Sequence, residues 1–147
     1  MIQSLLKKMN DRKICPELEV FDMGMIDYAK WLIKSELLKR PLYFNLLLGS
    51  VGTMQATPLN LALLVNSLPE GSTWAATGIG KSQFPINALA ITMGGQVRVG
   101  LEDSLFMDAG KKDLATNPRL VERLVRLARI VGREPASAED TRKIIGL

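Results

Sequence analysis

Apolar positions along the chain fall into two alternating patterns. Short runs rich in aliphatic, β-branched and aromatic residues predict four strands, at 18–22, 41–49, 72–80 and 96–103. The run PLYFNLLLG at 41–49 is almost continuously apolar, which is typical of a parallel strand covered on both faces.

Between these runs the apolar residues recur at helical spacing. This spacing predicts helices at 26–40, 59–68 and 85–93. A longer helix follows, with Asn117 as its N-cap, Pro118 at its first position and Gly132 near its end. A short terminal helix is predicted to begin at Ser137, with Asp140 as its capping-box partner.

The order of these elements predicts the fold class. Four strand-then-helix units repeat roughly every 25–30 residues, and such alternation predicts a parallel sheet in an α/β protein. Residues 1–13 look like the helix of a preceding unit, so the chain is expected to begin in mid-pattern. A (β/α)8 TIM barrel needs about 250 residues. Residues 1–147 are therefore interpreted as one domain that makes half of such a barrel.

Composition places the chain among soluble globular proteins. Of its 147 residues 47% are hydrophobic and 23% charged, and charges or prolines interrupt every apolar run before it could cross a bilayer. We find no secretion signal at the N-terminus. The single cysteine, Cys15, cannot form an internal disulfide and predicts a buried thiol in a reducing cytoplasm.

The formal net charge of +4 raises the question of an anionic partner. The densest basic group lies at helical spacing and comprises Arg119, Arg123, Arg126, Arg129 and Arg133. It fits a solvated helix face and, less well, an anion-binding surface. Aromatic residues do not interleave with these arginines, so the pattern argues against a nucleic-acid partner.

Candidate chemistry gathers where the predicted strands end, because ligand sites of parallel βα folds lie at the carboxyl ends of the strands. These positions are Glu19, Asp22, Gly49, Ser50, Gly52, Gly78, Gly80, Lys81, Glu102 and Asp103. No histidine occurs in the chain. The commonest metal ligand and the commonest general acid or base are therefore missing from any mechanism that this chain completes alone.

The run VRVGLED at 97–103 places charges in the last predicted strand. Strand alternation puts Arg98, Gly100 and Glu102 on one face, where Gly100 would let a ligand approach closely. A charge on a buried face is costly unless it is paired or binds a ligand. The spacing leaves two interpretations open: a functional site, or a structural ion pair between Arg98 and Glu102.

A glycine-rich segment, GIGKSQ at 78–83, links the third strand to the next helix. Its backbone N–H groups could bind a phosphate, with Gly78, Gly80 and Lys81 as the candidate residues. It matches neither the Walker nor the dinucleotide-binding pattern. A plain tight turn therefore remains the competing interpretation.

Several segments together resemble the β-keto acid cleavage enzyme family. In chain order they read PELEVFDMG, LLLG with GTMQATP, W followed by GIGKSQ, GGQVRVGLEDS, and LATNPRLVERLVRLARIVGREPASAEDTRKIIGL. They cover nearly the whole chain and are similar to the C-terminal half of the family's (β/α)8 barrel. The resemblance implies acyl exchange between a β-keto acid and acetyl-CoA through a metal-stabilised enolate, with zinc as the usual metal.

The resemblance also implies roles for single residues. Glu102 matches the family's metal-ligating glutamate, and Asp103 matches the acidic residue that helps to deprotonate the substrate. Arg98 matches the arginine that positions carboxylates beside that acid. Glu19 is expected to correspond to a further active-site glutamate.

Two departures from the family pattern limit what the isolated chain is expected to do. The family's His-x-His pair has no counterpart, and the motif that usually reads GGHVRVGLEDN has Gln96 and Ser104 here. Protein zinc sites normally supply three or four ligands, so Glu102 alone is not expected to hold zinc tightly. We therefore expect the isolated chain to be inactive.

A half-barrel leaves two sheet edges and an apolar face exposed. A second copy of the chain, or a separate N-terminal half, is therefore expected to cover them. The alternative is a non-catalytic half-barrel that serves as an interaction or binding module, or a truncated fragment that lacks the metal site. Neither nucleic acid nor membrane is expected as a partner.

Overall fold

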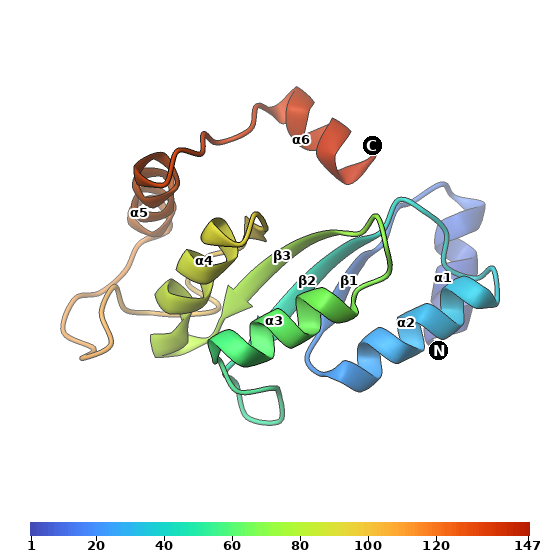
Figure 1. Cartoon of the computed structure of the whole chain (residues 1–147), viewed down its shortest axis with the longest axis horizontal. Coiled ribbons are helices and arrows are strands. Elements are labelled where there is room, and N and C mark those ends of the chain that lie inside the picture. Colours follow the sequence, from blue (N-terminus) through green and yellow to red (C-terminus); the bar gives the residue numbers. More distant parts are fainter.

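A computed structural model describes all residues 1–147 and contains one sheet of four parallel strands (Figure 1). In spatial order, which is also chain order, these are β1 Glu17–Val20, β2 Tyr43–Leu48, β3 Thr73–Gly78 and β4 Gln96–Val97. The predicted α/β class, the parallel sheet and the number of strands are confirmed. Neighbouring strands in chain order are neighbours in the sheet because each helix returns the chain to the next position along it.

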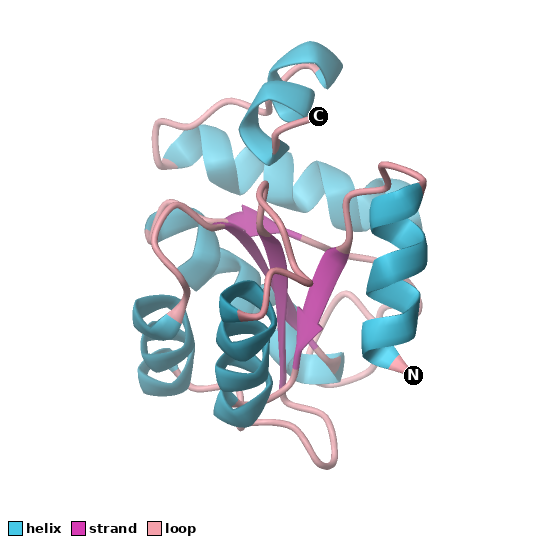
Figure 2. Ribbon diagram, turned by 90° about the vertical axis from the view of Figure 1, so that its right-hand side faces the viewer, coloured by secondary structure: helices cyan, strands magenta, loops and turns pink.

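Six α-helices surround the strands, as Figure 2 shows. They are α1 Ile2–Asp11, α2 Met23–Lys34, α3 Pro58–Ser67, α4 Gln83–Thr92, α5 Asn117–Ile130 and α6 Ala138–Ile145, with a 3-10 turn at Gly80–Ser82. The Ser137 cap is confirmed, because its hydroxyl oxygen accepts the backbone N–H of Asp140. None of the helices is long and apolar enough to span a membrane.

Three predicted boundaries are wrong. The fourth strand ends at Val97 and does not continue to Asp103. The second helix covers Met23–Lys34 and not 26–40, because Asp22 caps it by accepting the N–H of Met25 at 3.0 Å. The N-cap of α5 is Thr116, whose hydroxyl accepts the N–H of Arg119, and Asn117 is the first helical residue.

The core lies between the sheet and the helices that follow its strands. Phe44, Leu46 and Leu48 alternate along β2 and are fully buried. They belong to one apolar cluster with side chains from α2, α3 and α4, such as Ile26, Leu61 and Ile86. Burial of these side chains is the main stabilising contribution, at roughly 1.5–3 kcal/mol for each large one.

Strand alternation turns the residues between these apolar positions to the opposite side of the sheet, here called the inner face. On β1, β2 and β3 the inner face carries Glu19, Asn45 and Thr77 beside the apolar Leu47 and Ala75, so it is mixed where the helix-covered face is apolar. Glu19 and Asn45 are partners in the strand register. The fold therefore presents chemistry on one face and packs the other.

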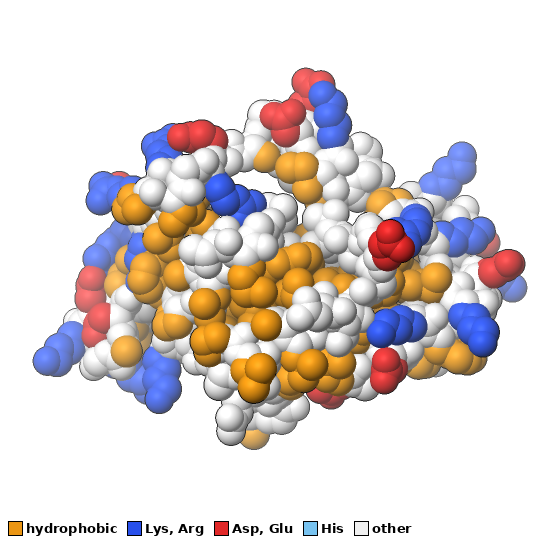
Figure 3. Space-filling view, viewed as in Figure 1, with side chains coloured by type: hydrophobic (Ala, Val, Ile, Leu, Met, Phe, Trp, Pro, Cys, Tyr) orange, Lys and Arg blue, Asp and Glu red, His pale blue; other side chains and the backbone are white.

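Apolar side chains also reach the outer surface. Figure 3 shows a band of them across the middle of one view, with charged side chains mostly around its edge. The most exposed one in α3 is Leu59, and in α2 Tyr28 and Trp31 stack with ring centroids 5.7 Å apart. Exposed apolar patches of this kind are typical of surfaces that meet another protein.

The remaining prediction about the fold concerned Cys15. It was expected to be buried and is only half-buried, so this prediction is wrong. Its Sγ lies 3.7 Å from the carbonyl oxygen of Pro41, at the amino-terminal end of the sheet. Cys15 precedes β1 and so lies at the opposite end of the parallel strands from the candidate site.

Candidate active site

One arginine joins three carboxylates at the carboxyl end of the sheet. The Nη1 atom of Arg98 lies 2.5 Å from Oε1 of Glu19, and its Nη2 atom lies 3.2 Å from Oδ1 of Asp103. A third carboxylate, that of Glu102, is 3.8 Å from Nη2. Arg98 directly follows β4 and Glu19 lies in β1, so the cluster joins the two edge strands of the sheet.

Two buried amides of α4 shape the segment that carries Arg98. The Nδ2 group of Asn87 donates to the carbonyl oxygens of Ala76 and Arg98, at 2.9 and 3.1 Å. The Nε2 group of Gln83 donates to the carbonyl oxygen of Gly100 at 3.2 Å. Beyond Val97, side chains of α4 satisfy the carbonyl oxygens of Arg98 and Gly100 where a neighbouring strand would otherwise do so. The regular strand pairing of β4 therefore stops after two residues.

Asp103 is fixed by its backbone as well as by Arg98. Its N–H donates to the carbonyl oxygen of Gly100 at 3.1 Å, and its own carbonyl oxygen accepts the N–H of Gly80 at 2.7 Å. Its side chain is only 3% exposed. The turn therefore holds the Asp103 carboxylate in one place beside the guanidinium.

Burial and charge have opposite effects on this carboxylate. Burial raises the pKa of Asp103 above its ordinary value; the hydrogen bond and the charge of Arg98 lower it, and the charges of Glu102 and Glu19 add to the rise. For Arg98, burial lowers the pKa, but hydrogen bonds to Glu19 and Asp103 outweigh burial and raise it overall. A carboxylate with a raised pKa beside a permanent cation suits a proton acceptor.

The glycine-rich segment adjoins this cluster. Gly78 is closely packed, because a Cβ atom there would lie 2.2 Å from the carbonyl oxygen of Ser82. The N–H of Gly80 already donates to Asp103, which makes this segment a tight turn that supports the site. Lys81 is exposed and forms no ion pair. Binding of a cofactor by Gly78, Gly80 and Lys81 stays a prediction.

Two inner-face residues were missed from the sequence. Asn45 and Thr77 are fully buried, and the hydroxyl of Thr77 donates to Oδ1 of Asn45 at 2.9 Å. The Nδ2 group of Asn45 is buried without a partner. The sequence does indicate Asn45, because a polar residue inside the apolar run YFNLLL is unusual. In the strand register it is the partner of Glu19 and lies on the same face.

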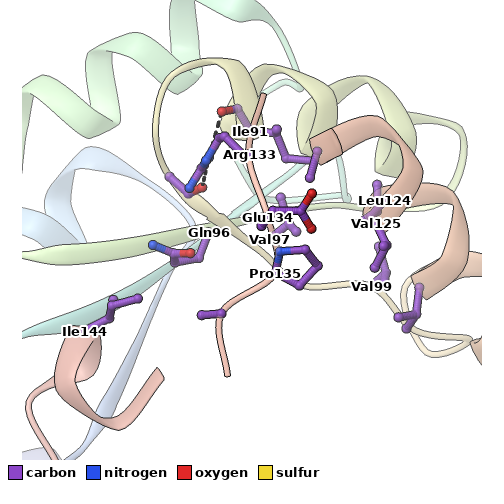
Figure 4. Close-up of a pocket in the computed structure, with 14 residues that line it drawn as sticks. Ile91, Gln96, Val97, Val99, Leu124, Val125, Arg133, Glu134, Pro135 and Ile144 are labelled. Atoms are coloured by element: carbon purple, nitrogen blue, oxygen red, sulfur yellow. Dashed lines mark hydrogen bonds between the residues drawn. The ribbon is translucent and has the colours of Figure 1, made fainter. Parts of the chain in front are cut away.

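The most apolar cavity lies away from these charges, beside the free edge of β4 (Figure 4). Its volume is about 300 Å³, and Val97, Val99, Leu124 and Val125 contribute to its lining. Arg133, also on its wall, donates to the carbonyl oxygens of Ile91 and Gly95 and so closes the end of α4. This cavity holds none of the carboxylates around Arg98.

Comparison with known proteins identifies the family. The whole chain, residues 1–147, matches the beta-keto acid cleavage enzyme family. The chain belongs to this family. Its Arg98, Glu102 and Asp103 lie in the segment GGQVRVGLEDS, which carries the strongest part of the resemblance.

Several curated relatives align with all or nearly all of this chain. The 3-keto-5-aminohexanoate cleavage enzyme of Fusobacterium nucleatum is 44% identical over 146 residues, which cover 99% of this chain and 53% of the relative. The same-named enzyme of Acetoanaerobium sticklandii is 40% identical, over all of this chain and 54% of the relative. A 3-dehydrocarnitine:acetyl-CoA trimethylamine transferase of Rhizobium meliloti is 33% identical, over all of this chain and 48% of the relative. The chain thus spans about half the length of these relatives.

Membership of the family raises the question of zinc, and the residues of this chain do not fit a complete zinc site. No three histidine, cysteine, aspartate or glutamate side chains are grouped so as to hold a metal ion. Glu102 is 87% exposed, and no histidine exists to join it. The predicted inner-face position of Glu102 is also wrong, because strand alternation ends at Val97 and Glu102 lies in a turn. Its role as a metal ligand stays a prediction.

Proposed function

We propose that this chain forms the half of a beta-keto acid cleavage enzyme that carries the catalytic base, and that the enzyme exchanges acyl groups between a β-keto acid and acetyl-CoA. The observation that carries the proposal is the buried Asp103 carboxylate held 3.2 Å from Arg98 at the carboxyl end of a parallel sheet. The family supports it, because its members in Fusobacterium nucleatum and Acetoanaerobium sticklandii are named as enzymes that cleave 3-keto-5-aminohexanoate. The Rhizobium meliloti relative supports acetyl-CoA as the second substrate.

Asp103 is the proposed base. In a β-keto acid the C–H group next to the keto carbon is acidic, because the electron pair left behind spreads onto the keto oxygen as an enolate. Asp103 takes that proton. Because its pKa is raised, the free energy of moving the proton from the substrate carbon to the Asp103 carboxylate is smaller. The enolate carbon attacks the acetyl carbonyl of acetyl-CoA, a C–C bond forms, and the C–S bond breaks so that coenzyme A leaves as its thiolate. The thiolate then attacks the original keto carbonyl. Cleavage of the bond between that carbonyl and the former enolate carbon releases the new CoA ester, and the carbon set free takes back the proton that Asp103 holds, which gives acetoacetate.

Arg98 and Glu19 are proposed to position the base. Both terminal nitrogens of Arg98 already donate, one to Glu19 and one to Asp103, so the guanidinium fixes the distance between β1 and the turn that carries Asp103. A planar guanidinium with two carboxylate partners holds a more defined orientation than an ammonium group would. A substrate carboxylate that bound to Arg98 would share these donors.

The architecture is proposed to be half of a (β/α)8 barrel. Glu19 and Arg98 belong to opposite edges of the sheet and contact each other on its inner face, as side chains that line the inside of a barrel would. β1 and β4 each have one unpaired edge, and the apolar cavity of Figure 4 adjoins that of β4. A second copy of the chain, or the half of the relatives that this chain does not match, is proposed to pair with these edges. Cytoplasmic location also stays a proposal.

The absence of histidine favours one alternative function. In this alternative the chain is a half-barrel interaction or binding module. Arg98 then has a structural role only, as the ion-pair partner of Glu19 and Asp103. The two functions differ in whether Asp103 is needed for turnover.

The experiment compares the chain alone with the chain co-expressed with the unmatched half of the Fusobacterium nucleatum relative. Each is incubated with acetyl-CoA and 3-keto-5-aminohexanoate, and new CoA esters are measured by mass spectrometry. We expect exchange only in the co-purified pair, and a rate about 10²–10⁴-fold lower with Asp103→Asn. Asp27→Asn is the control, because Asp27 is exposed on α2 and its ion-pair partner is Lys30 on the same helix, not a residue of the cluster. A co-purified pair without exchange, or full activity of Asp103→Asn, would reject the proposal.

A further inference from the structure

Arg123 differs from its neighbours on α5. Three other arginines of this helix each form an ion pair with a carboxylate: Arg119 with Asp113, Arg126 with Glu122 and Arg129 with Glu134. Arg123 is half-buried and has no carboxylate within ion-pair distance. Arg123 is therefore a partly desolvated guanidinium whose charge no carboxylate neutralises.

The guanidinium of Arg123 is held in place. It lies over the ring of Phe84, with 4.5 Å from Cζ to the ring centroid, and its Nη1 group donates to the carbonyl oxygen of Met107 at 2.5 Å. Its Nε group is buried without a partner. Burial, and then repulsion from Arg119, lower the pKa of Arg123, so an anion at this place would relieve both costs.

A hollow beside Arg123 leads toward the candidate active site. A cavity of about 220 Å³ is lined by Arg123, Phe84, Lys81 and Asp108. The adjacent cavity, of about 230 Å³, shares Lys81 and Asp108 with it and also reaches Asp103. The two cavities are neighbours with a shared wall and are together called the basic groove, with Arg123 at one end and the proposed base, Asp103, at the other.

Two further cations line the basic groove without ion pairs. Lys81 borders both cavities, and Lys111 borders the cavity next to Asp103. Both are exposed, and neither lies within 4 Å of a carboxylate. Asp108, which also lines the groove, has an oxygen that accepts the N–H groups of Lys112 and Asp113, at 3.1 and 2.8 Å. Glu102 and Asp103 also line the cavity at the end next to Arg98, with which both carboxylates interact. Arg123, Lys81 and Lys111 are therefore the cations of the groove that have no ion pair of their own.

We propose that the basic groove binds the phosphate groups of a coenzyme A thioester, with Arg123, Lys81 and Lys111 as the binding side chains. The proposal deepens the proposed function, because it names where the second substrate would lie relative to Asp103. A guanidinium suits a phosphate because its N–H fork can donate to two oxygens at once, and lysines add mobile positive charge. The fixed position of Arg123 reduces the conformational entropy that is lost on binding.

Binding of four probes to the full chain tests the proposal by calorimetry at low salt. The probes are coenzyme A, dephospho-coenzyme A, inorganic pyrophosphate and pantetheine. We expect coenzyme A and pyrophosphate to bind and pantetheine, which has no phosphate, to bind at least about 10-fold more weakly, in line with one lost charge-assisted contact of about 1.5–3 kcal/mol. Dephospho-coenzyme A shows whether the pyrophosphate or the 3′-phosphate occupies the groove.

Variants then assign the binding to the groove. Arg123→Met is expected to weaken coenzyme A binding about 10-fold or more, and Lys81→Met and Lys111→Met about 3–10-fold each. Arg129→Met is the matched control on the same helix and should bind as the wild type does, because Arg129 pairs with Glu134 and lines neither cavity. If Arg123→Met unfolds, the two lysine variants test the site instead. The side chains of Lys81 and Lys111 make no hydrogen bond in the structure, so their removal should not affect folding.

Wild-type chain that does not bind pyrophosphate or coenzyme A, or variants that bind as tightly as Arg129→Met, would overturn the proposal. These measurements need no turnover. Coenzyme A binding through Arg123 without acyl exchange would reject the proposed function and leave this site intact. Acyl exchange with unchanged coenzyme A affinity in all three variants would reject the site alone.

Discussion

Arg98 and Glu19 belong to opposite edges of a four-stranded parallel sheet, and yet their Nη1 and Oε1 atoms are 2.5 Å apart. Two strands, β2 and β3, lie between them in the sheet. Neighbouring strands are about 4.8 Å apart, so a flat sheet would separate the two edges by roughly 14 Å. The long side chains of the arginine and the glutamate reach toward each other across this distance. The pair therefore connects the two edges of the sheet at the place where Asp103 is held.

Removing Arg98 should destabilise the chain more than removing Glu19. Arg98→Met leaves the buried Asp103 carboxylate without its cation, and we expect a loss of about 2–3 kcal/mol in the free energy of unfolding. Glu19 is 44% exposed, so Glu19→Gln should cost only about 0.5–1 kcal/mol. Urea unfolding measures both. The double variant Arg98→Met/Asp103→Asn should be more stable than Arg98→Met, and equal or lower stability would show that the charge of Asp103 is not what Arg98 compensates.

The proton affinity of Asp103 can be measured directly. Burial raises its pKa above the ordinary value of about 3.8 and Arg98 lowers it, so Arg98→Met should raise the pKa further. Glu102→Gln should lower it, because a neighbouring negative charge is removed. NMR titration of the Asp103 side-chain carboxyl carbon distinguishes these directions, and a pKa at or below 3.8 in the wild type would contradict the prediction.

The same shift has a consequence for stability. The folded chain binds the Asp103 proton more tightly than the unfolded chain, so wild-type stability should fall relative to Asp103→Asn as pH rises from the unfolded pKa to the raised folded pKa. Above the folded pKa of Asp103, the difference in unfolding free energy between the wild type and Asp103→Asn should no longer change with pH.

Gly78 and Gly100 should respond differently to alanine. A Cβ atom at Gly78 would lie 2.2 Å from a backbone oxygen of Ser82, so Gly78→Ala must shift the turn that supports Asp103. We expect it to cost about 3 kcal/mol or more. At Gly100 the nearest atom would be Oδ1 of Asn117, at 3.9 Å, and Gly100→Ala should change stability by less than about 1 kcal/mol. Thermal unfolding of both variants checks this, and equal losses would mean that the turn at Gly78 is not closely packed in solution.

Much of the fold could be predicted from the sequence because the signals are local. The apolar runs and helix stop signals predict four parallel strands and the helices in the right order, and they err most at the ends of the second helix and the fourth strand. The end of β4 could not be predicted, because the side chains that replace its ladder, Gln83 and Asn87, belong to a helix that precedes the strand. The Asn117 cap failed for a similar reason, since its side chain accepts the N–H of Leu101 and Thr116 caps the helix.

The candidate site was predictable in part. Residues close in sequence, such as Arg98 and Asp103, could be grouped from the motif, and the structure brings them together. The direct pairing of Arg98 with Glu19 depends on the arrangement of all four strands, which no single segment encodes. Strand alternation fails for Glu102, because β4 ends at Val97 and Glu102 lies in a turn.

Asn87 should be the most sensitive of the polar residues behind the site. It is fully buried, and its Nδ2 group serves the carbonyl oxygens of Ala76 and Arg98. Asn87→Ala leaves these groups with fewer donors and should cost about 2–3 kcal/mol. It should also speed hydrogen exchange at the amides of Asp103 and Ser104, which close the next turn. Asn66→Ala, at an exposed position of α3, is the matched control and should change stability by less than about 0.5 kcal/mol.

The last prediction concerns zinc, and it follows from the donor set of the chain. Glu102 follows β4 at the carboxyl end of the sheet, Cys15 precedes β1 at the other end, and the chain has no histidine. A zinc site needs three or four protein ligands at one place, and one exposed carboxylate binds the ion only weakly. Elemental analysis of the purified chain after dialysis should therefore find zinc far below one equivalent, with Glu102→Gln no different. In the co-purified pair with the unmatched half of a relative, zinc should rise toward one equivalent and Glu102→Gln should lower it. Near-stoichiometric zinc on the chain alone would show that Glu102 has partners that the structure does not bring together.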